Sequence, residues 1–566
     1  MDRNHQLDLF GRQIYALASF NNRYNPLLKL ISISYTPHSF LKGMRGWPVH
    51  STRDSLRYAV ALFCSEDHRW YSRATEIVRK IISLQIGKCG HKHYGNWPKY
   101  WEEHLVGIYR IDENWANFIS TYLIEILILH RNKLPTDFHR KVENSIQKSI
   151  RYIQNRELSL DYTNIIVSTI YVILVFGEYM EDEALISDGV SLLSTFHSHT
   201  IHQQSFSEYN SPNYQVVTLK NLARLRRDVK DSNAQKLICD LYYLAWQNIA
   251  ENFHPPTAQW SGSHTRSYST LLKPEVLALL KRSTTESVQF SASSLHPPPD
   301  ERFLTYDCPS DLEHLFQKLD KPRRIIRTLS CGQRFTTFLT PEFSLGSVTW
   351  SDFWHQRNVL IAYWGTPQRP CYLRLRFLHG EQDFSAAYFR SVQKDNKILA
   401  GISLATDIDI KNPYQGEHKI SQKKILVKDL RLRFEFGGFA EIQQCKLPED
   451  CSLPIILKSE NIRFKLRIPY VRFGSNGVQW ERHTTQSTTC LDLLLNNSTN
   501  SPALFSEITE AVIGAAVEIS QDDQDIADVS IEDRESSLEM KWEELALGIW
   551  KKPAPRAILQ TLKVDI

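Results

Sequence analysis

The sequence lacks the signatures of several common protein classes. Its net charge is only +4, from 67 basic and 63 acidic residues, so charge alone indicates neither a nucleic-acid nor a membrane partner. It contains no GxGxxG, P-loop or GxSxG motif, which leaves nucleotide-binding and serine-hydrolase functions without support. The longest apolar run, IIVSTIYVILVF at 165–176, is too short to span a bilayer and predicts a buried helix.

The cysteines also lack a pattern. All nine are scattered, with no CxxC or zinc-type spacing, which is typical of reduced thiols in an intracellular protein. The first 20 residues have an acidic residue directly after Met1 and show no basic region followed by an apolar run. We therefore expect no signal peptide, no membrane insertion and a cytoplasmic location.

The composition describes a globular protein with many aromatic residues. Apolar residues make up 42% and charged residues 23% of a chain of 566 residues, which predicts two large domains. Aromatic residues make up 11%, and many stand beside Gly, Pro or His instead of inside apolar runs. Some of these aromatic side chains are expected to line a groove that stacks sugar rings, and the others to lie in the core.

The periodicity of apolar residues changes near 283–305. Before this point apolar residues recur every three or four positions, which predicts helices; after it they alternate, which predicts strands. The sequence thus predicts a multidomain α and β protein: an N-terminal helical domain at 1–283, a linker at 284–300 and an antiparallel β-sandwich at 301–566. The repeated motifs described below predict that the helical domain is an (α/α) helical toroid. The acidic segment 521–539 predicts a solvated loop.

Short polar motifs recur through the helical half. They are HSTRDS (50–55), DENW (112–115), DYTN (161–164), EYNSPNY (208–214) and SGSHTRSY (261–268). Their key positions stand about 50 residues apart, which is typical of a helical-hairpin repeat and places all the motifs on one rim of a ring. These key positions are Asp54, Asn114, Asn164, Asn210 and His264.

Helix capping is the alternative explanation for these motifs. Asp54, Asp112, Asp161 and Asn210 are good N-cap residues, and Pro212 suits a first helical turn. A cap needs no Arg or aromatic neighbour, however, and such neighbours occur in the motifs. The repetition therefore favours a shared site.

The order of the two halves, helical and then strand-rich, and the polar motifs resemble those of a known protein family. The chain resembles the heparinase II/III-like and chondroitin-lyase-like polysaccharide lyases, and in motif it resembles toroid-plus-sandwich proteins with HxxRDS, YTNI and EYNSPxY. The resemblance covers about 30–390 and includes QRNVLIAYW and LHGEQDF at 356–384. It implies an Asn–His or Asn–Tyr pair and an Arg in the groove. Residues of these types are Asn210, Tyr214, His264, Arg266 and Tyr268, although within these motifs no Asn is followed directly by His.

The chemistry of such lyases suggests roles for these residues. β-Elimination removes the proton next to a uronate carboxylate, so the site must neutralise that carboxylate and supply a base. Asn210 and Arg266 are suited to neutralisation. Tyr214 or Tyr268 is the base or acid, because a neighbouring Arg can lower a tyrosine pKa, and His264 is the other partner. The expected ligand is an acidic oligo- or polysaccharide.

Two other functions stay open. A glycoside hydrolase would use Glu208 with a second carboxylate such as Asp54, Asp112, Glu102 or Glu103. Glu208 could instead form a salt bridge with Arg53 or Arg266. A non-catalytic glycan-binding or assembly protein is the third candidate.

Further positions are predicted to bind substrate or are considered for metals. The predicted substrate contacts are Arg53, Asp54, Trp97, Tyr100, Trp101, Asn114, Trp115, Asn164, His355 and Arg357. Cys89, His91, His93 and His104 fit no standard zinc spacing, so their loop (87–104) is better explained by its aromatic residues. His379 and Asp383 could hold a structural metal, but no cofactor is expected. The oligomeric state is left open.

Overall fold

The chain forms two compact units. The structure is a computed structural model that describes residues 17–34, 47–104, 111–285, 298–407, 426–427, 429–443, 446–474, 477–495, 503–504, 507–522, 524, 526–562 and 564–565. The first unit comprises Met1–His202, Val217–Tyr243 and Leu295–Asp307, and the second comprises Gln203–Val216, Leu244–Ser294 and Cys308–Ile566.

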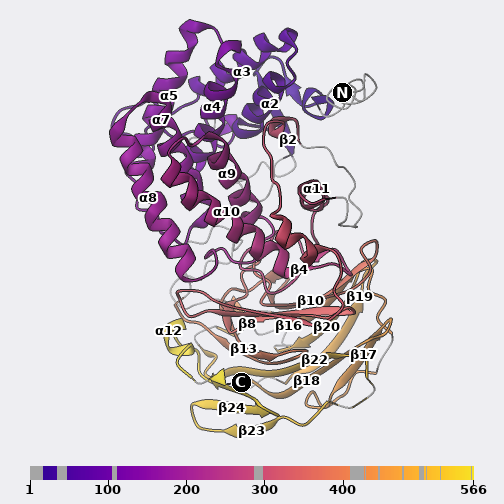
Figure 1. Cartoon of the computed structure of the whole chain (residues 1–566). Coiled ribbons are helices and arrows are strands. Elements are labelled where there is room, and N and C mark those ends of the chain that lie inside the picture. Colours follow the sequence, from indigo (N-terminus) through magenta and orange to yellow (C-terminus); the bar gives the residue numbers. More distant parts are fainter. Residues whose placement is uncertain are drawn as a thin grey trace. The chain divides into compact units, whose positions relative to one another are not determined.

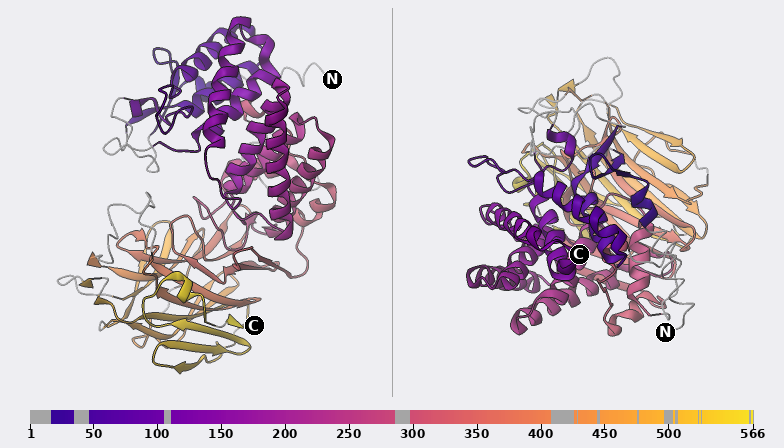
Figure 2. Two further views of the ribbon diagram at one scale, coloured as in Figure 1. Left: turned by 90° about the vertical axis from the view of Figure 1, so that its left-hand side faces the viewer. Right: turned by 90° about the horizontal axis from the view of Figure 1, so that it is seen from above.

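Helices dominate the first unit (Figure 1). They are α2 (Thr52–Cys64), α3 (Tyr71–Ser83), α4 (Trp115–His130), α5 (Thr136–Gln154), α6 (Thr163–Ile170), α7 (Phe176–Met180), α8 (Glu183–His202) and most of α9 (Tyr214–Asp228) and α10 (Ser232–Asn252). Helix α2 packs against α3, α4 against α5 and α7 against α8, and Figure 2 shows these helices from two further directions. A small antiparallel sheet of β1 (Tyr24–Asn25), β2 (Leu30–Ser34) and β3 (Pro48–Ser51) precedes α2.

The apolar spacing of the helices agrees with their burial. In α5 the buried positions include Phe138, Val142, Ile146, Ile150 and Ile153, which lie on one face. The run 165–176 is buried in α6, in the π-helical turn Tyr171–Val175 and in the start of α7, as predicted. Among the described residues, the helical stretch Thr163–Met180 is the one that could cross a membrane by length and composition, and 83% of it is buried inside the fold.

The second unit contains two large sheets. One has the order β19-β20-β16-β11-β10-β8-β7-β6, with β12 beside β11; the other has the order β17-β18-β22-β14-β13-β9. The first sheet comprises β6 (Arg323–Thr328), β7 (Arg334–Leu339), β8 (Phe343–Val348), β10 (Leu360–Gly365), β11 (Pro370–His379), β12 (Gln382–Asp383), β16 (Leu430–Gly438), β19 (Gln479–Thr484) and β20 (Thr488–Leu494). The second comprises β9 (Trp350–Asp352), β13 (Ala387–Lys394), β14 (Lys397–Leu404), β17 (Ile455–Ser459), β18 (Ile462–Phe473) and β22 (Ala511–Ser520).

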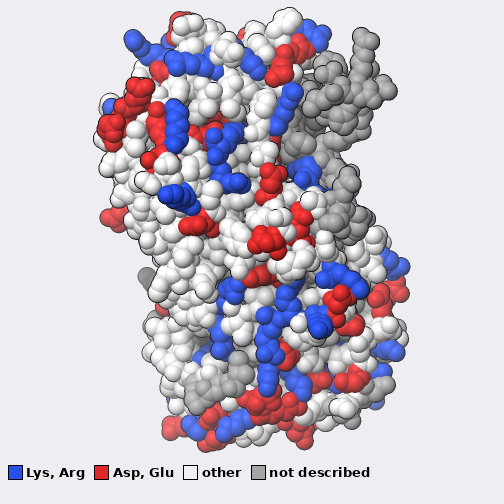
Figure 3. Space-filling model, viewed as in Figure 1, with Lys and Arg blue, Asp and Glu red and all other residues white. Residues whose placement is uncertain are grey.

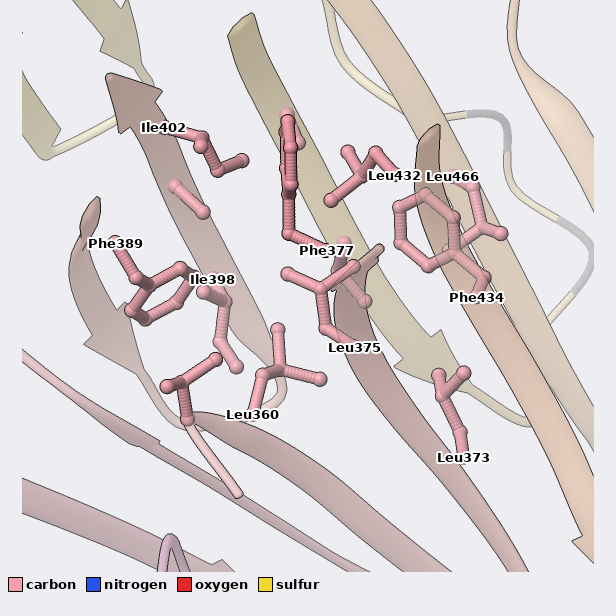
Figure 4. Close-up of a cluster of buried hydrophobic side chains, with 14 of the residues drawn as sticks. Leu360, Leu373, Leu375, Phe377, Phe389, Ile398, Ile402, Leu432, Phe434 and Leu466 are labelled. Carbon is pink, nitrogen blue, oxygen red and sulfur yellow. The ribbon is translucent and has the colours of Figure 1, made fainter. Parts of the chain in front are cut away.

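The core of this unit confirms the predicted antiparallel arrangement. All pairings within the two sheets are antiparallel, and alternate side chains point inward. Figure 4 shows Phe377 of β11, Phe434 of β16, Phe389 of β13 and Leu466 of β18 in one buried cluster. A helical region followed by an antiparallel β-rich region is therefore confirmed.

Two segments at the ends of the strand region refine the sequence predictions. The helix-to-strand change lies between α11 (Pro274–Ser283) and β6, and residues 286–297 of the predicted linker lie outside the described residues. The acidic segment 521–539 is not a simple loop, because it contains β23 (Ser530–Asp533) and the start of β24 (Ser537–Trp542). Leu538, Met540 and Trp542 alternate into the core there, a period-two pattern that the surrounding acidic residues obscure. These strands form a sheet with β25 (Leu545–Trp550) and β26 (Val564–Asp565).

Candidate active site

The EYNSPNY stretch forms the turn before α9, and Asn210 lies buried inside it. Asn210 has a left-handed φ of +49° and no exposed surface. Its Nδ2 donates to the carbonyls of Ser261 at 2.7 Å and Ser263 at 3.1 Å, and its Oδ1 accepts from the indole N–H of Trp260. Both N–H donors are used, so the prediction that Asn210 neutralises a substrate carboxylate is wrong: Asn210 fastens the segment 261–263.

Neighbouring contacts explain why the turn has this shape. Ser211, not Asn210, caps the helix start, because its Oγ accepts from the backbone N–H of Tyr214 at 3.1 Å and donates to the Arg266 carbonyl at 2.5 Å. Gly262 has φ +90°, and a Cβ there would lie 2.2 Å from Thr337 Oγ1 and 2.8 Å from Asn210 Nδ2. Only glycine fits this position.

His264 is also a structural residue. It is 2% exposed; its Nε2 donates to the Trp260 carbonyl at 3.0 Å, and its Nδ1 accepts from Asn358 Nδ2 at 3.0 Å. Burial lowers the pKa of His264 to about 4, so the ring is neutral at neutral pH. Its prediction as a proton-transfer partner is wrong, because both ring nitrogens already have partners.

Tyr214, Arg266 and Tyr268 meet in the second unit. Arg266 Nη2 donates to the Tyr214 hydroxyl at 2.6 Å, and the guanidinium carbon lies 3.8 Å from the centre of the Tyr214 ring. The Tyr214 hydroxyl also bonds the Tyr268 hydroxyl. Tyr268 is 42% exposed, whereas Tyr214 is half-buried, so the three groups lead from the interior to the surface.

The electrostatics of Tyr214 differ from the sequence-based expectation. Burial raises the pKa of Tyr214 well above its usual range, and this effect outweighs the lowering by Arg266. Tyr214 therefore keeps its proton at neutral pH. Because Arg266 can only donate, the Tyr214 oxygen accepts from Arg266, and in the bond between Tyr214 and Tyr268 either hydroxyl can be the donor.

Glu208 and Gln356 hold Arg266 in place. Arg266 Nη1 donates to Glu208 Oε1 at 3.1 Å, and its Nε and Nη2 each lie 3.2 Å from Gln356 Oε1. Glu208 is 6% exposed and Gln356 is 1% exposed. The salt bridge considered for Glu208 from the sequence is thus present, and this geometry does not favour Glu208 as a hydrolytic acid.

The segment 353–358 adds aromatic and basic side chains to the cluster. The Trp354 ring lies 5.4 Å from the guanidinium carbon of Arg266 and 5.8 Å from that of Arg357, and it meets the His355 ring edge-on at 5.3 Å. Arg357 Nη1 pairs with Asp352 at 2.7 Å. His355 and Arg357 are half-buried, and their contact with substrate stays a prediction.

The other predicted motifs meet inside the first unit. Trp115 Nε1 donates to Thr52 Oγ1 at 2.7 Å, and Asn114 Nδ2 donates to the Tyr162 hydroxyl at 2.8 Å. Trp115 is 6% and Asn164 is 1% exposed, so neither has a free surface for substrate. Arg53, Asp54 and Asn114 are half-buried, and their contact with substrate stays a prediction, as does a rim shared with the second unit.

The aromatic loop differs from its predicted role. Trp97 is completely buried with its indole N–H on the Ile81 carbonyl at 2.9 Å, and Tyr100 is 1% exposed, so their prediction as exposed sugar platforms is wrong. Trp101 is half-buried beside His50, at 6.4 Å between ring centres, and is the remaining candidate. Nearby, Glu102 pairs with His50 at 2.6 Å, and burial raises the pKa of Glu103 to about 7.

No metal cluster is present in the part of the chain that the structure describes. His379 is 6% exposed, and Asp383 is held by Arg376 at 2.7 and 2.9 Å. Both carboxylate oxygens of Asp383 thus accept hydrogen bonds from Arg376.

Sequence reasoning overlooked Gln356 and Trp354. Both stand within FWHQRN, from which only His355 and Arg357 were selected. A buried Gln between two basic residues is a weak signal, because its partner Arg266 lies 90 residues earlier.

On the face that Figure 3 shows, Lys and Arg side chains are interspersed with Asp and Glu side chains, and the net charge of the sequence is +4. This agrees with the small overall charge of the chain.

Comparison with known proteins gives few named relatives. Residues 34–299 match the sequence profile of a domain of unknown function, DUF8769. No curated protein is detectably similar in sequence to the chain.

Several solved polysaccharide lyases are similar in structure. A chondroitin AC lyase from Streptomyces coelicolor A3, in complex with chondroitin sulphate, has a TM-score of 0.48 at 10% identity, covering 96% of this chain and 84% of that one. A heparinase III has a TM-score of 0.36 at 9% identity, covering 96% and 90%. A chondroitinase AC lyase solved with oligosaccharides has a TM-score of 0.40 at 10% identity, covering 95% and 86%. The chain is thus similar to solved toroid polysaccharide lyases over most of its length, at 9–10% identity.

Proposed function

We propose that the chain is a lyase that cleaves a uronate-containing oligo- or polysaccharide by β-elimination. The observation that supports this most is the series of hydrogen bonds from Arg266 through the Tyr214 hydroxyl to the hydroxyl of the partly exposed Tyr268. Such a series can stabilise negative charge on the outermost oxygen while a proton moves.

Each residue has a role in this proposal. Tyr268 reacts as its phenolate: its oxygen takes the proton next to the substrate carboxylate, and the electron pair of that C–H bond forms a C=C bond as the glycosidic C–O bond breaks. The leaving oxygen then receives a proton from the Tyr268 hydroxyl. Tyr214 and Arg266 donate toward Tyr268, and Glu208 and Gln356 keep Arg266 in place.

A panel of uronate glycans tests this function. Elimination makes an unsaturated product that absorbs in the ultraviolet, whereas hydrolysis makes new reducing ends without that absorbance. We expect the absorbance to rise with at least one uronate glycan and to depend on Tyr268. New reducing ends without absorbance would establish a hydrolase instead.

A glycan-binding protein without catalysis is the second candidate. It is favoured by the structural commitment of Asn210 and His264, since the Asn–His pair implied by the resemblance is not free to act. Binding of a uronate glycan with no cleavage product over a long incubation would support this candidate.

A further inference from the structure

Lys99 and Arg53 are two cations of the first unit whose charged groups contact aromatic rings. The Lys99 Nζ atom lies 5.4 Å from the centre of the Tyr100 ring and 5.3 Å from that of the Trp115 ring. The guanidinium carbon of Arg53 lies 4.5 Å from the centre of the Phe118 ring. Both side chains are half-buried, so each cation has lost part of its hydration.

The backbone and the aromatic rings bring the two cations together. Thr52, which precedes Arg53, donates from its backbone N–H to the Lys99 carbonyl at 3.1 Å. The Thr52 hydroxyl oxygen also accepts from the Trp115 indole N–H at 2.7 Å. The rings of Trp115 and Phe118 meet edge-on, with 5.6 Å between their centres. The first turns of α2 and α4 therefore place both cations against one pair of touching rings.

The donor groups of the two cations are unused. Within the part of the chain that the structure describes, neither the Lys99 ammonium nor the Arg53 guanidinium makes a hydrogen bond or an ion pair. Arg53 Nε is buried in this state. Burial lowers the pKa of Lys99, and the neighbouring charge of Arg53 lowers it further. An anion between the two groups would supply the missing partner.

Three carboxyl groups act on Lys99 electrostatically, but each has another partner. Asp54 pairs with Arg57 at 3.6 Å. Asp112 and Glu103 each accept from a backbone N–H, at 3.0 and 2.8 Å respectively. Their charges raise the pKa of Lys99 without reversing the effect of burial. The nearby acids thus moderate the positive charge of the cluster and leave its side-chain donors unpaired.

We infer that Lys99 and Arg53 form a binding site for an oxyanion, and that its occupant is a carboxylate or sulfate group of an acidic glycan. An ammonium and a guanidinium with unused donors are suited to such a group, because charge-assisted hydrogen bonds to an oxyanion are strong. The site itself stands on the contacts of the two cations, and its assignment to a glycan rests on the proposed function. The sequence predicted Arg53 as a substrate contact, whereas Lys99 was overlooked.

Binding of inorganic sulfate to the full-length chain tests the site. We expect one equivalent to bind in a calorimetric titration at low ionic strength, with chloride as the control for a general salt effect. Lys99→Met and Arg53→Met each remove one cation and keep an apolar stem against the rings. Each should weaken sulfate binding by about tenfold or more, the scale of one lost hydrogen bond to a charged group.

Two other cations of the first unit provide matched controls. Lys133 Nζ lies 5.4 Å from the centre of the Tyr71 ring but already donates to the Phe63 carbonyl at 2.8 Å. The guanidinium carbon of Arg79 lies 4.5 Å from the centre of the Phe138 ring, but Arg79 is exposed to solvent. Lys133→Met and Arg79→Met should change the affinity for sulfate by less than about twofold, because isolated surface charges contribute little.

A measurement on the unsubstituted chain does not depend on the folding of any variant. A lysine with a lowered pKa reacts with acetic anhydride through its neutral amine. Bound sulfate favours the charged ammonium and covers it, so sulfate should slow the acetylation of Lys99 and leave that of Lys133 unchanged. Mass spectrometry of the digested protein measures both rates.

The inference is overturned if sulfate binds no better than chloride, if the control variants weaken binding as much as Lys99→Met and Arg53→Met, or if sulfate does not slow the acetylation of Lys99. A uronate tetrasaccharide should displace sulfate, and its carboxyl-reduced counterpart should not. Displacement by both, or by neither, overturns the assignment to a glycan. Displacement by the uronate form alone, without cleavage of any uronate glycan, would contradict the proposed function and leave the site intact.

Discussion

The guanidinium of Arg266 donates a hydrogen bond to the Tyr214 hydroxyl at 2.6 Å and also lies 3.8 Å from the centre of the Tyr214 ring. One cation thus contacts both the oxygen and the ring of the same tyrosine. The Tyr214 hydroxyl is in turn hydrogen-bonded to the Tyr268 hydroxyl, so the more exposed outer tyrosine is the residue through which the cluster can act on a ligand.

The first prediction concerns the Tyr268 hydroxyl. Tyr268→Phe removes only this exposed group, so the urea midpoint should not change. If the hydroxyl transfers the proton, kcat should fall by roughly 10²–10⁴, the usual contribution of general acid–base catalysis. The rate of ultraviolet absorbance increase on a uronate glycan measures the effect.

Glu208→Gln serves as the control for that variant. Glutamine keeps an oxygen acceptor for Arg266, so the fall in kcat should stay below about tenfold, within the loss expected for weakening one charged hydrogen bond. Abolished turnover in Glu208→Gln together with tolerance of Tyr268→Phe would point to hydrolysis by a carboxylate pair.

The second prediction concerns Asn210 as a structural residue. Asn210→Ala removes three hydrogen bonds. It also leaves an alanine at a left-handed φ, without the side-chain hydrogen bonds that stabilise asparagine in this conformation. We expect the free energy of unfolding to fall by roughly 2–4 kcal/mol. Asn210→Gly should be milder than Asn210→Ala by about 1 kcal/mol, because glycine adopts positive φ without strain. Urea unfolding followed by tryptophan fluorescence compares the two variants.

A catalytic role for Asn210 would give another result. Turnover would then fall by more than tenfold in both variants while the folded fraction stayed unchanged at low urea. Loss of activity that follows the loss of folded protein would instead agree with the structural role.

The fold was predictable from periodicity, because burial acts on each element locally. Phe138, Val142 and Ile146 of α5 stand one helical turn apart, and Leu432 and Phe434 of β16 alternate with Arg431 and Arg433. The chemistry of single residues was less predictable, because it depends on distant partners. His264 looks free in SGSHTRSY, but its Nδ1 accepts from Asn358, 94 residues later.

The N-cap residues of the helices were also difficult to predict from the sequence. Ser51 caps α2 by accepting from Asp54 N–H, and Ser211 caps α9, so the neighbouring Asp54 and Asn210 are not the caps. Asp112 does accept from Asn114 N–H at 3.0 Å. Composition identifies where a helix begins to within a few residues, but backbone geometry decides which polar side chain closes it.

The third prediction separates two tryptophans of one loop. Trp97 is fully buried, so Trp97→Ala should lower the free energy of unfolding by roughly 3–5 kcal/mol. Trp101 is half-buried, so Trp101→Ala should keep the fold and weaken glycan binding by roughly 1–3 kcal/mol, the scale of a lost stacking contact. Calorimetric titration with a uronate oligosaccharide measures the binding term. Unchanged affinity in Trp101→Ala would exclude Trp101 from the binding surface.

The last prediction concerns acid stability. Burial lowers the pKa of His264 to about 4, whereas an unfolded chain has an ordinary histidine pKa of about 6.5. Below pH 6.5 the unfolded chain therefore takes up a proton that the folded chain does not, and stability falls as the pH decreases toward 4. His264 alone should account for a loss of about 3 kcal/mol over this window and for no change above it. His264→Gln is the matched variant, because its amide can donate to the Trp260 carbonyl and accept from Asn358 without titrating. Urea midpoints of both proteins at several pH values between 4.5 and 7.5 should show a shallower pH dependence in His264→Gln. Equal slopes would mean that His264 is not buried as a neutral ring, and they would restore it as a candidate for proton transfer.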